Sequence, residues 1–332
     1  MSDENLKILG AIAAATAAIV VAVLSAGIGF ISNRSNQRDI ERLKAQLLED
    51  KGESDAKRAY AYEALKRLYA QYEPIRFHLV ESVEAAIKAI QDLADIAKTQ
   101  TSESEGSYPQ GKYLRAARVY HLLAPAAYFK IMQSRLTLVD LAASKPSYLQ
   151  YLLAKHACLV LTCDREAANY FSLPYTPYVQ GWRELRQQNP ERFRRQGFAF
   201  GRFDNAVCAI IRHSEDGTQR VLTFGDFEEV ANAVERTDYN SPLGAALDLF
   251  DDFSPNMRPV LWRCLLVQFS MYQLFVHAAR TGIGRVEDVV EYLPVVRKRI
   301  EQLGISSEVS NQIVQYLSTG PLAEIYTSHS DA

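Results

Sequence analysis

The sequence predicts a mainly α-helical protein: a single N-terminal transmembrane helix followed by a mostly helical cytosolic domain with a small β-ribbon. Three observations lead to this fold class. No charged residue occurs from Ile8 to Asn33, helical periodicity covers most of the remaining chain, and one short segment combines strand-forming residues with a turn signal. The 332 residues are 48% hydrophobic and 23% charged, as in folded proteins. The net charge of −2 provides no overall attraction to nucleic acid, so such binding needs a local patch.

The uncharged stretch has the length of a membrane anchor. Its 26 residues, Ile8 to Asn33, form a helix of about 39 Å, and the hydrocarbon core of a bilayer is roughly 30 Å thick. The opening sequence "MSDENLK" lacks the basic region of a secretory signal peptide. Basic residues follow the stretch: Arg34, Arg38, Arg42 and Lys44. The positive-inside rule therefore predicts an outward-facing N-terminus and a cytoplasmic C-terminal domain.

Small side chains gather on one side of this predicted helix. About one third of its circumference holds Ala11, Ala14, Ala15, Ala18, Ala22, Ser25, Ala26 and Gly29. Bulky residues such as Ile19 and Val20 lie on the other side. In lipid, small residues favour helix association because they let two backbones approach closely. We therefore predict a homo-oligomer that packs through this face and builds any pore from several subunits. The alternative is that alanine merely fills a weakly hydrophobic anchor.

Composition and periodicity divide the chain into six segments. They are a transmembrane helix (1–33), a juxtamembrane coil (34–52), a helical stalk or hairpin (53–98), a loop (99–112), a helical cytosolic domain (113–320) and a tail (321–332). Ile40, Leu43 and Leu47 give the coil a 3-4 apolar spacing. Pro74 predicts a kink or break in the stalk, because proline removes a helical hydrogen bond.

Helical periodicity predicts the elements of the cytosolic domain. The expected helices cover 113–142, 147–171, 226–236, 242–252, 257–281, 285–302 and 307–318. The segment 257–281 is the most apolar, but Arg263 and Gln268 interrupt it. Polar residues inside a membrane span are costly, so we expect a central core helix there rather than a second span.

One segment, 198–224, has strand character. Within it, "AVCAII" and "RVLTF" flank "RHSEDGTQ", in which Asp216-Gly217 is a hairpin signal. The sequence therefore predicts a two-stranded ribbon on the helical domain.

Arginine and phenylalanine alternate in "RFRRQGFAFGRF", from Arg192 to Phe203. An aromatic ring that stacks on a nucleobase contributes about 1–3 kcal/mol, and guanidinium groups pair with phosphate oxygens. The candidate ligand-binding residues are Arg192, Arg194, Arg195, Phe198, Phe200, Arg202 and Phe203. Gly197 and Gly201 would let the backbone come close to a ligand. The segment partly matches an RNA-recognition octamer, but its helical surroundings exclude that four-stranded fold.

The same residues have structural interpretations. Residues 182–202 carry six arginines and two acids, whereas residues 215–252 carry ten acids and two arginines. In one alternative, the basic and acidic segments pair with each other, within one subunit or between subunits. In another, the three phenylalanines are core residues of the ribbon. A second basic cluster, Arg115, Arg118 and His121, has helical spacing. It either lines a groove shared with the ligand-binding segment Arg192–Phe203 or, as we favour, forms a solvated face.

The sequence predicts no catalytic site, no cofactor and no metal site, and therefore no enzyme. The G-x-x-x-x-G-K-[ST] loop, the G-x-S-x-G elbow and the H-E-x-x-H helix do not occur in it. Asp226, Glu228 and Glu229 are carboxylates of the kind that bind divalent metals. They also lie near a predicted helix start, where acids match the helix dipole.

The whole plan resembles the membrane effectors of bacterial antiphage defence, and is most similar to the membrane-channel component of Hailong-type systems. The resemblance rests on the architecture and on Arg192–Phe203. It implies an inner-membrane location, an oligodeoxyadenylate ligand and a nucleotidyltransferase encoded nearby. The expected function is an oligomeric channel subunit that senses a nucleotide or single-stranded oligonucleotide. The alternatives are a membrane-tethered scaffold that docks a protein partner and, less favoured, a tethered metal-dependent nuclease.

Overall fold

The structure, a computed structural model, describes residues 55–98, 112–136, 141–177, 179–215, 217–234, 241–250 and 253–330. Three predicted segments lie outside these residues: the transmembrane helix, the juxtamembrane coil and most of the loop. The predicted packing residues of the transmembrane helix are therefore not described: Ala11, Ala15, Ala18, Ala22, Ala26 and Gly29. Contacts divide the chain into two units, Met1–Glu63 and Ala64–Ala332. The described residues are mainly helical with one small sheet, so this part of the predicted fold class is confirmed.

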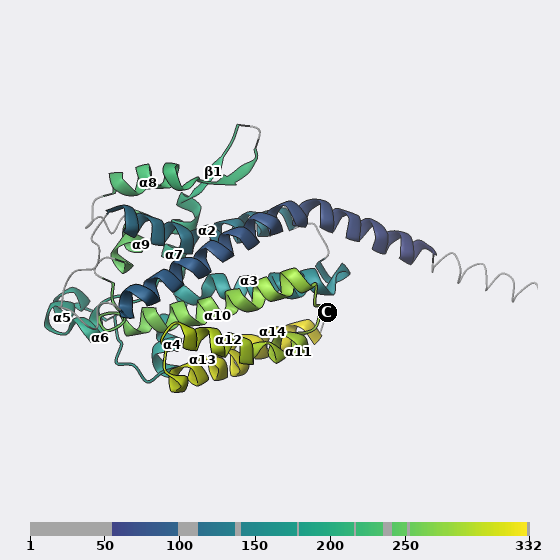
Figure 1. Cartoon of the computed structure of the whole chain (residues 1–332). Helices are drawn as coiled ribbons and strands as arrows, with labels where there is room; N and C mark the ends of the chain where they lie inside the picture. The colour runs from purple at the N-terminus through teal and green to yellow at the C-terminus, as the bar shows by residue number, and fades with distance from the viewer. Residues whose placement is uncertain are drawn as a thin grey trace, which may run out of the picture. The chain divides into compact units, whose positions relative to one another are not determined.

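Helices form most of the second unit (Figure 1). A helix over residues 55–98 is followed by α2 (Lys112–Leu136), η1 (Leu141–Ala143), α3 (Lys145–Leu159), η2 (Val160–Thr162), α4 (Asp164–Tyr170), α5 (Trp182–Gln188), α6 (Pro190–Phe193) and α7 (Phe200–Ala209). The strands β1 (Ile211–His213) and β2 (Gln219–Val221) come next. The chain continues with α8 (Phe224–Ala233), α9 (Gly244–Leu249), α10 (Pro259–Thr281), α11 (Val286–Glu291), α12 (Leu293–Gln302), α13 (Ser307–Thr319) and α14 (Pro321–Ser330).

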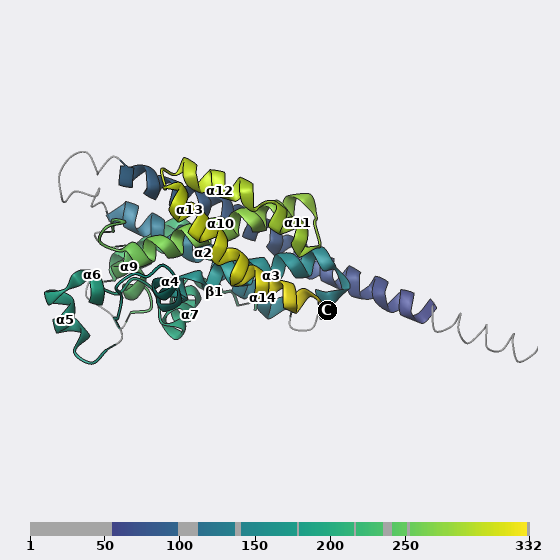
Figure 2. The same ribbon diagram turned by 90° about the horizontal axis from the view of Figure 1, so that it is seen from below.

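The helix α10 lies at the centre of this unit. It runs beside α3 in both ribbon views (Figures 1 and 2). Leu261, Leu265, Phe269 and Tyr272 on successive turns are fully buried. Among the described residues, α10 is the helix that is long and apolar enough to cross a membrane, and 89% of its most apolar window is buried within the chain. The burial confirms the predicted core helix.

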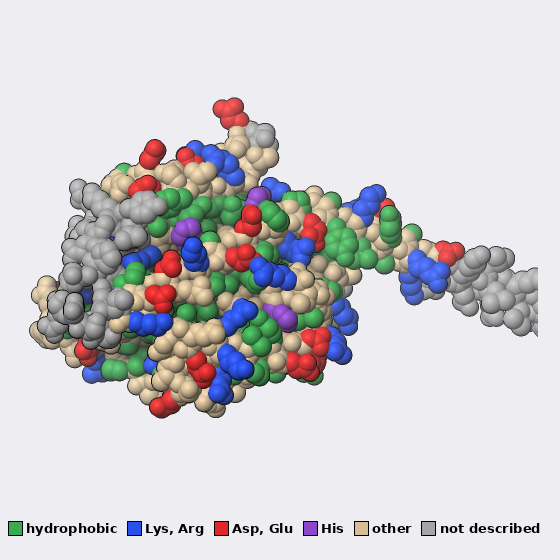
Figure 3. Space-filling model, in the orientation of Figure 1, with side chains coloured by type: hydrophobic (Ala, Val, Ile, Leu, Met, Phe, Trp, Pro, Cys, Tyr) green, Lys and Arg blue, Asp and Glu red, His purple; other side chains and the backbone are tan. Residues whose placement is uncertain are grey.

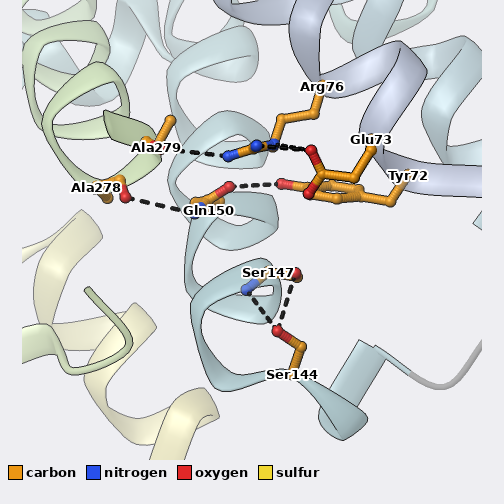
Figure 4. Close-up of polar contacts among 8 residues, drawn as sticks. All are labelled: Tyr72, Glu73, Arg76, Ser144, Ser147, Gln150, Ala278 and Ala279. Atoms are coloured by element: carbon orange, nitrogen blue, oxygen red, sulfur yellow. Dashed lines mark hydrogen bonds and ion pairs between the residues drawn. The ribbon is translucent and has the colours of Figure 1, made fainter. Parts of the chain in front are cut away.

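Polar contacts join α10 to two neighbouring helices (Figure 4). The Tyr72 hydroxyl donates a hydrogen bond to Gln150 Oε1 (3.0 Å), and Gln150 Nε2 donates to the carbonyl of Ala278 (3.4 Å). Arg76 Nη1 donates to the carbonyl of Ala279 (3.2 Å). These bonds reach carbonyls at the C-terminal end of α10 and hold it against α3 and the helix over 55–98.

Of the predicted kink or break at Pro74, the break does not occur, because helical residues continue from 55 to 98. Pro74 is exposed, and so is Ala70, whose carbonyl loses its helical donor and can be hydrated instead. Tyr72 and Ile75 are buried on the opposite side. The packing of these two side chains, one before and one after the proline in the sequence, therefore offsets the missing hydrogen bond.

Three other predicted boundaries require correction. The segment 147–171 is interrupted by η2, and 285–302 is interrupted at Tyr292, just before Pro294. Proline lacks the N–H group that would continue the preceding helix. The predicted tail instead forms α14, in which Leu322 and Ile325 are buried at helical spacing.

The ribbon within 198–224 is confirmed but is shorter than predicted. The strands pair antiparallel, with Ile211 opposite Val221. Gly217 has a φ of 79°, which glycine adopts without steric cost, and its N–H donates to the carbonyl of Ser214 (3.0 Å). Most of "AVCAII" belongs to α7 instead, because Ala206 and Val207 bury one helical face together with Phe203.

Replacing Tyr72 by Phe tests the buried link between helices. The variant leaves Gln150 Oε1 without its donor, so we expect the free energy of unfolding to fall by about 1–3 kcal/mol. Tyr69→Phe is the matched control, because Tyr69 lies on the same helix and its side chain is exposed. Denaturant unfolding of the full chain in detergent measures both. Equal stabilities of the two variants would contradict the assigned role of the bond.

Candidate nucleic-acid interface

The arginine-rich region begins with two short helices, α5 and α6. Gly181 precedes α5 with a φ of 72°, and Asn189 separates the two helices. The Asn189 side chain accepts a hydrogen bond from the Arg192 N–H (3.2 Å) and caps α6, which begins at Pro190. The backbone N–H of Thr176 donates to the Arg192 carbonyl (2.9 Å). Local capping and this bond fix the direction in which the arginines leave the backbone.

Gln196 anchors the following turn in the interior. The residue is fully buried, and its backbone N–H donates to the Tyr175 hydroxyl (2.9 Å). Its side-chain Nε2 donates to the Glu191 carbonyl (3.0 Å), while Oε1 accepts from the Val260 N–H (2.8 Å). Val260 lies in the first turn of α10, so Gln196 caps that turn with a side chain from a distant segment.

Gly197 permits a close approach between two segments of the protein rather than an approach to a ligand. A Cβ atom at Gly197 would lie 2.3 Å from Asp164 Cβ. Asp164 is buried and accepts a hydrogen bond from the Tyr175 hydroxyl (2.5 Å). The Phe198 N–H donates to the Leu161 carbonyl (2.9 Å) directly after this contact. Gly201, by contrast, has nothing within 4 Å of the corresponding position.

Arg258 forms a second anchor for the same region. Its guanidinium is fully buried; Nη1 donates to the Arg195 carbonyl and Nη2 to the Asp248 carbonyl, both at 2.5 Å. The Asp248 carboxylate forms an ion pair with Arg186 (3.7 Å). The Arg186–Asp248 ion pair is an example of the alternative in which the basic and acidic segments pair.

Two of the three predicted stacking rings are core residues. Phe198 and Phe203 are 2% and 4% exposed, and their ring centroids are 5.4 Å apart. Phe200 is 63% exposed. The sequence prediction assumed an extended segment, but residues 200–209 form α7, which points Phe203 inward. A platform of three phenylalanines is therefore wrong.

Different aromatic residues accompany the arginines. The guanidinium carbons of Arg183 and Arg195 lie 5.9 and 5.2 Å from the ring centroid of Trp182. That of Arg192 lies 5.4 Å from the ring of Phe193. Arg183 and Arg192 are exposed, and the other three are half-buried. We call these five residues the arginine–tryptophan surface. The sequence signal for Trp182 was its position at the start of the arginine-rich region.

The remaining predicted arginines lie beside this surface in the sequence. Arg202 is exposed on α7, and Arg194 is half-buried directly after α6. Basic and acidic side chains are interspersed over the face drawn in Figure 3.

The second basic cluster is not a solvated face. Arg118 is 8% exposed, and the His121 ring stacks on Phe224 with centroids 6.3 Å apart. Burial lowers the pKa of His121, which favours its neutral form. The cluster lies on α2 against α8, so packing, rather than hydration, determines its role.

Of the three carboxylates near the start of α8, Asp226 caps the helix. Thr223 and Asp226 form a capping box, and the hydrogen bond from Thr223 lowers the pKa of Asp226. Arg220 lies 3.5 Å from the Asp226 carboxylate. Within the described ranges, no group of three His, Cys, Asp or Glu side chains is placed to hold a metal ion.

Comparisons of the chain with protein-family models, with curated proteins and with solved structures found no match.

Gly197→Ala tests the close approach that positions the arginine-rich region. The added methyl group overlaps Asp164, so we expect the free energy of unfolding to fall by about 1–3 kcal/mol. Gly201→Ala is the control; with free space around it in α7, we expect unchanged stability or a gain of less than about 1 kcal/mol. Thermal or denaturant unfolding measures both changes. Similar values for the two variants would show that the contact at Asp164 does not constrain the turn.

Proposed function

We propose that this chain is an oligomeric membrane effector, or channel subunit, whose cytosolic domain senses a nucleotide or single-stranded oligonucleotide. Binding alters the integrity of the inner membrane, in antiphage defence. The uncharged stretch from Ile8 to Asn33 and the basic residues after it support the anchor and its orientation. In this proposal the ligand is oligodeoxyadenylate, and a nucleotidyltransferase encoded nearby supplies it.

The arginine–tryptophan surface is the observation that carries the sensing part of the proposal. Arg183 and Arg195 lie against the ring of Trp182, and Arg192 lies against Phe193. Aromatic faces stack on bases without sequence preference, and arginine pairs with the phosphates between them. A single-stranded chain offers both groups at short, regular intervals. This combination fits an oligonucleotide better than it fits a lone anion.

The proposed route from ligand to membrane passes through α10. Arg195 belongs to the surface, and its carbonyl accepts the hydrogen bond from buried Arg258 just before α10. At the other end of α10, Arg76 binds the Ala279 carbonyl from the helix over 55–98. A ligand shifts this packing only to the extent that it binds one arrangement better than another.

A membrane-tethered scaffold is the second candidate. Tyr69 and Phe77 are 48% and 61% exposed on the helix over 55–98, and exposed aromatic residues are common in protein interfaces. Recovery of a stoichiometric protein partner, without ion leakage, would favour this function. The tethered nuclease has less support, because Asp226 already serves as a helix-capping residue.

Enlarging the small face of the predicted membrane helix tests the effector function. Ala18→Leu with Ala22→Leu prevents close approach of the backbones, so we expect the variant to lose the membrane depolarisation caused by the full chain in bacteria. The control is Val20→Leu, which lies on the bulky side and leaves depolarisation intact. A potential-sensitive dye in growing cells reports the result. Undiminished depolarisation by the double variant would rule out packing through this face.

Neutralising two arginines tests the ligand. Arg183→Gln with Arg195→Gln removes both cations next to Trp182, so we expect affinity for labelled single-stranded oligodeoxyadenylate to fall about tenfold or more. The salt dependence of binding also becomes shallower, by about one in slope for each phosphate that is no longer bound. Lys155→Gln with Lys298→Gln has the same charge change at exposed positions on α3 and α12. Fluorescence anisotropy across a salt series measures both. Equal binding by the two double variants would remove oligonucleotide sensing from this surface.

A further inference from the structure

Arg263, a half-buried residue of α10, differs from the buried arginines of the described chain. Its Nε atom is buried without a hydrogen-bond partner, and no ion pair or hydrogen bond with a described residue reaches its guanidinium. The guanidinium lies next to the ring of Phe171, whose centroid is 5.8 Å from the guanidinium carbon. Arg258 is buried more deeply, yet it donates to two backbone carbonyls. A buried donor without an acceptor is costly, and an acceptor from a ligand would satisfy it.

The ring of Phe171, which lies next to this cation, packs against two tyrosine rings. The centroid of Phe171 lies 5.2 Å from that of Tyr170 and 5.8 Å from that of Tyr316. Tyr170 and Tyr316 meet edge to face, with centroids 4.9 Å apart. Tyr170 is 39% exposed, so part of its ring is accessible. We call Arg263, Tyr170, Phe171 and Tyr316 the Arg263 cluster.

The electrostatics at the Arg263 guanidinium favour an anion. Burial lowers the pKa of Arg263, and no acidic neighbour opposes this shift. Burial raises the pKa of Tyr316, and the nearby carboxylates of Glu166 and Glu324 raise it further, so its hydroxyl stays protonated and can donate a hydrogen bond. A partly desolvated guanidinium without a carboxylate partner gains more from an incoming anion than a hydrated one does.

We propose that the Arg263 cluster is a binding site for a planar ring that carries a phosphate group, the chemistry of a mononucleotide. The guanidinium takes the phosphate, and the exposed face of Tyr170 stacks on the ring. The cluster is built from α10, α13 and the end of α4, whereas the arginine–tryptophan surface is built from α5, α6 and the turn after α6. The inference therefore goes beyond the proposed function and does not depend on the membrane segment.

Calorimetric titration of the full chain in detergent tests the site with three probes. Adenosine monophosphate carries both chemical groups, adenosine carries the ring alone, and inorganic phosphate carries the anion alone. We expect adenosine monophosphate to bind about tenfold or more tightly than either fragment, because each fragment makes only one of the two interactions. Phosphate that binds as tightly as the nucleotide would overturn the assignment of a ring site.

Two variants separate the interactions. Arg263→Met weakens adenosine monophosphate binding by about tenfold or more. It leaves the melting temperature unchanged or higher, because an unsatisfied buried donor is removed. Tyr170→Leu weakens binding of the nucleotide by roughly fivefold or more but leaves binding of phosphate unchanged. Arg280→Met is the control on the same helix; its exposed guanidinium pairs with Glu84 (2.6 Å), and nucleotide affinity is retained.

The proposal is overturned if adenosine monophosphate does not bind at millimolar concentration. It is also overturned if Arg263→Met retains full affinity, or lowers the melting temperature while affinity persists. The experiments distinguish a failure of mononucleotide binding at the Arg263 cluster from a failure of oligonucleotide binding at the arginine–tryptophan surface. The Arg183→Gln, Arg195→Gln variant keeps its mononucleotide affinity under this proposal, whereas the reverse pattern would place mononucleotide binding at the arginine–tryptophan surface.

Discussion

The burial of the first turn of α10 is the constraint on which the second unit depends. N–H groups in the first turn of a helix have no acceptor within that helix, and a buried turn cannot use water instead. Gln196 supplies the acceptor for the Val260 N–H. Arg258, directly before the helix, donates to the carbonyls of Arg195 and Asp248. The chain around 195–198 must therefore lie against α10, whatever its exposed side chains do.

This requirement explains why the arginine–phenylalanine sequence serves two purposes. Gln196, Gly197 and Phe198 face the interior, where they bond, fit against Asp164 and pack. Arg192 and Arg195, on either side of the α6 C-terminus, present guanidinium groups beside aromatic rings. Because the backbone is already fixed from inside, an incoming ligand has less conformational entropy to remove. The packing of residues 195–198 against α10 thus both orders this backbone and positions the exposed arginine side chains beside it.

Sequence reasoning recovered what local periodicity encodes. The expected helix at 307–318 corresponds to α13, the core helix at 257–281 to α10, and the Asp216-Gly217 signal to the ribbon. It did not recover α5, α6 or α7, which are short and are held by contacts such as that between Gln196 and Val260, 64 residues apart. Phe198 and Phe203 were misplaced for the same reason: a pattern of residue types does not say which side a distant helix covers. The isolation of Arg263 is likewise invisible without its neighbours.

Arg195 joins the exposed and buried parts of this arrangement in one residue. Its side chain lies over Trp182, and its carbonyl accepts from Arg258 in the interior. A ligand that moves the Arg195 side chain changes the buried hydrogen bond from Arg258 to the Arg195 carbonyl only if the backbone of Arg195 moves as well. Because close-packed interiors change between discrete arrangements rather than continuously, that movement is opposed until a second arrangement of the α10 end becomes comparable in energy. A binding preference of about 1.4 kcal/mol for the second arrangement changes the ratio of the two populations tenfold. Coupling between the surface and the helices is thus set by how the ligand discriminates between two packings, not by how tightly it binds.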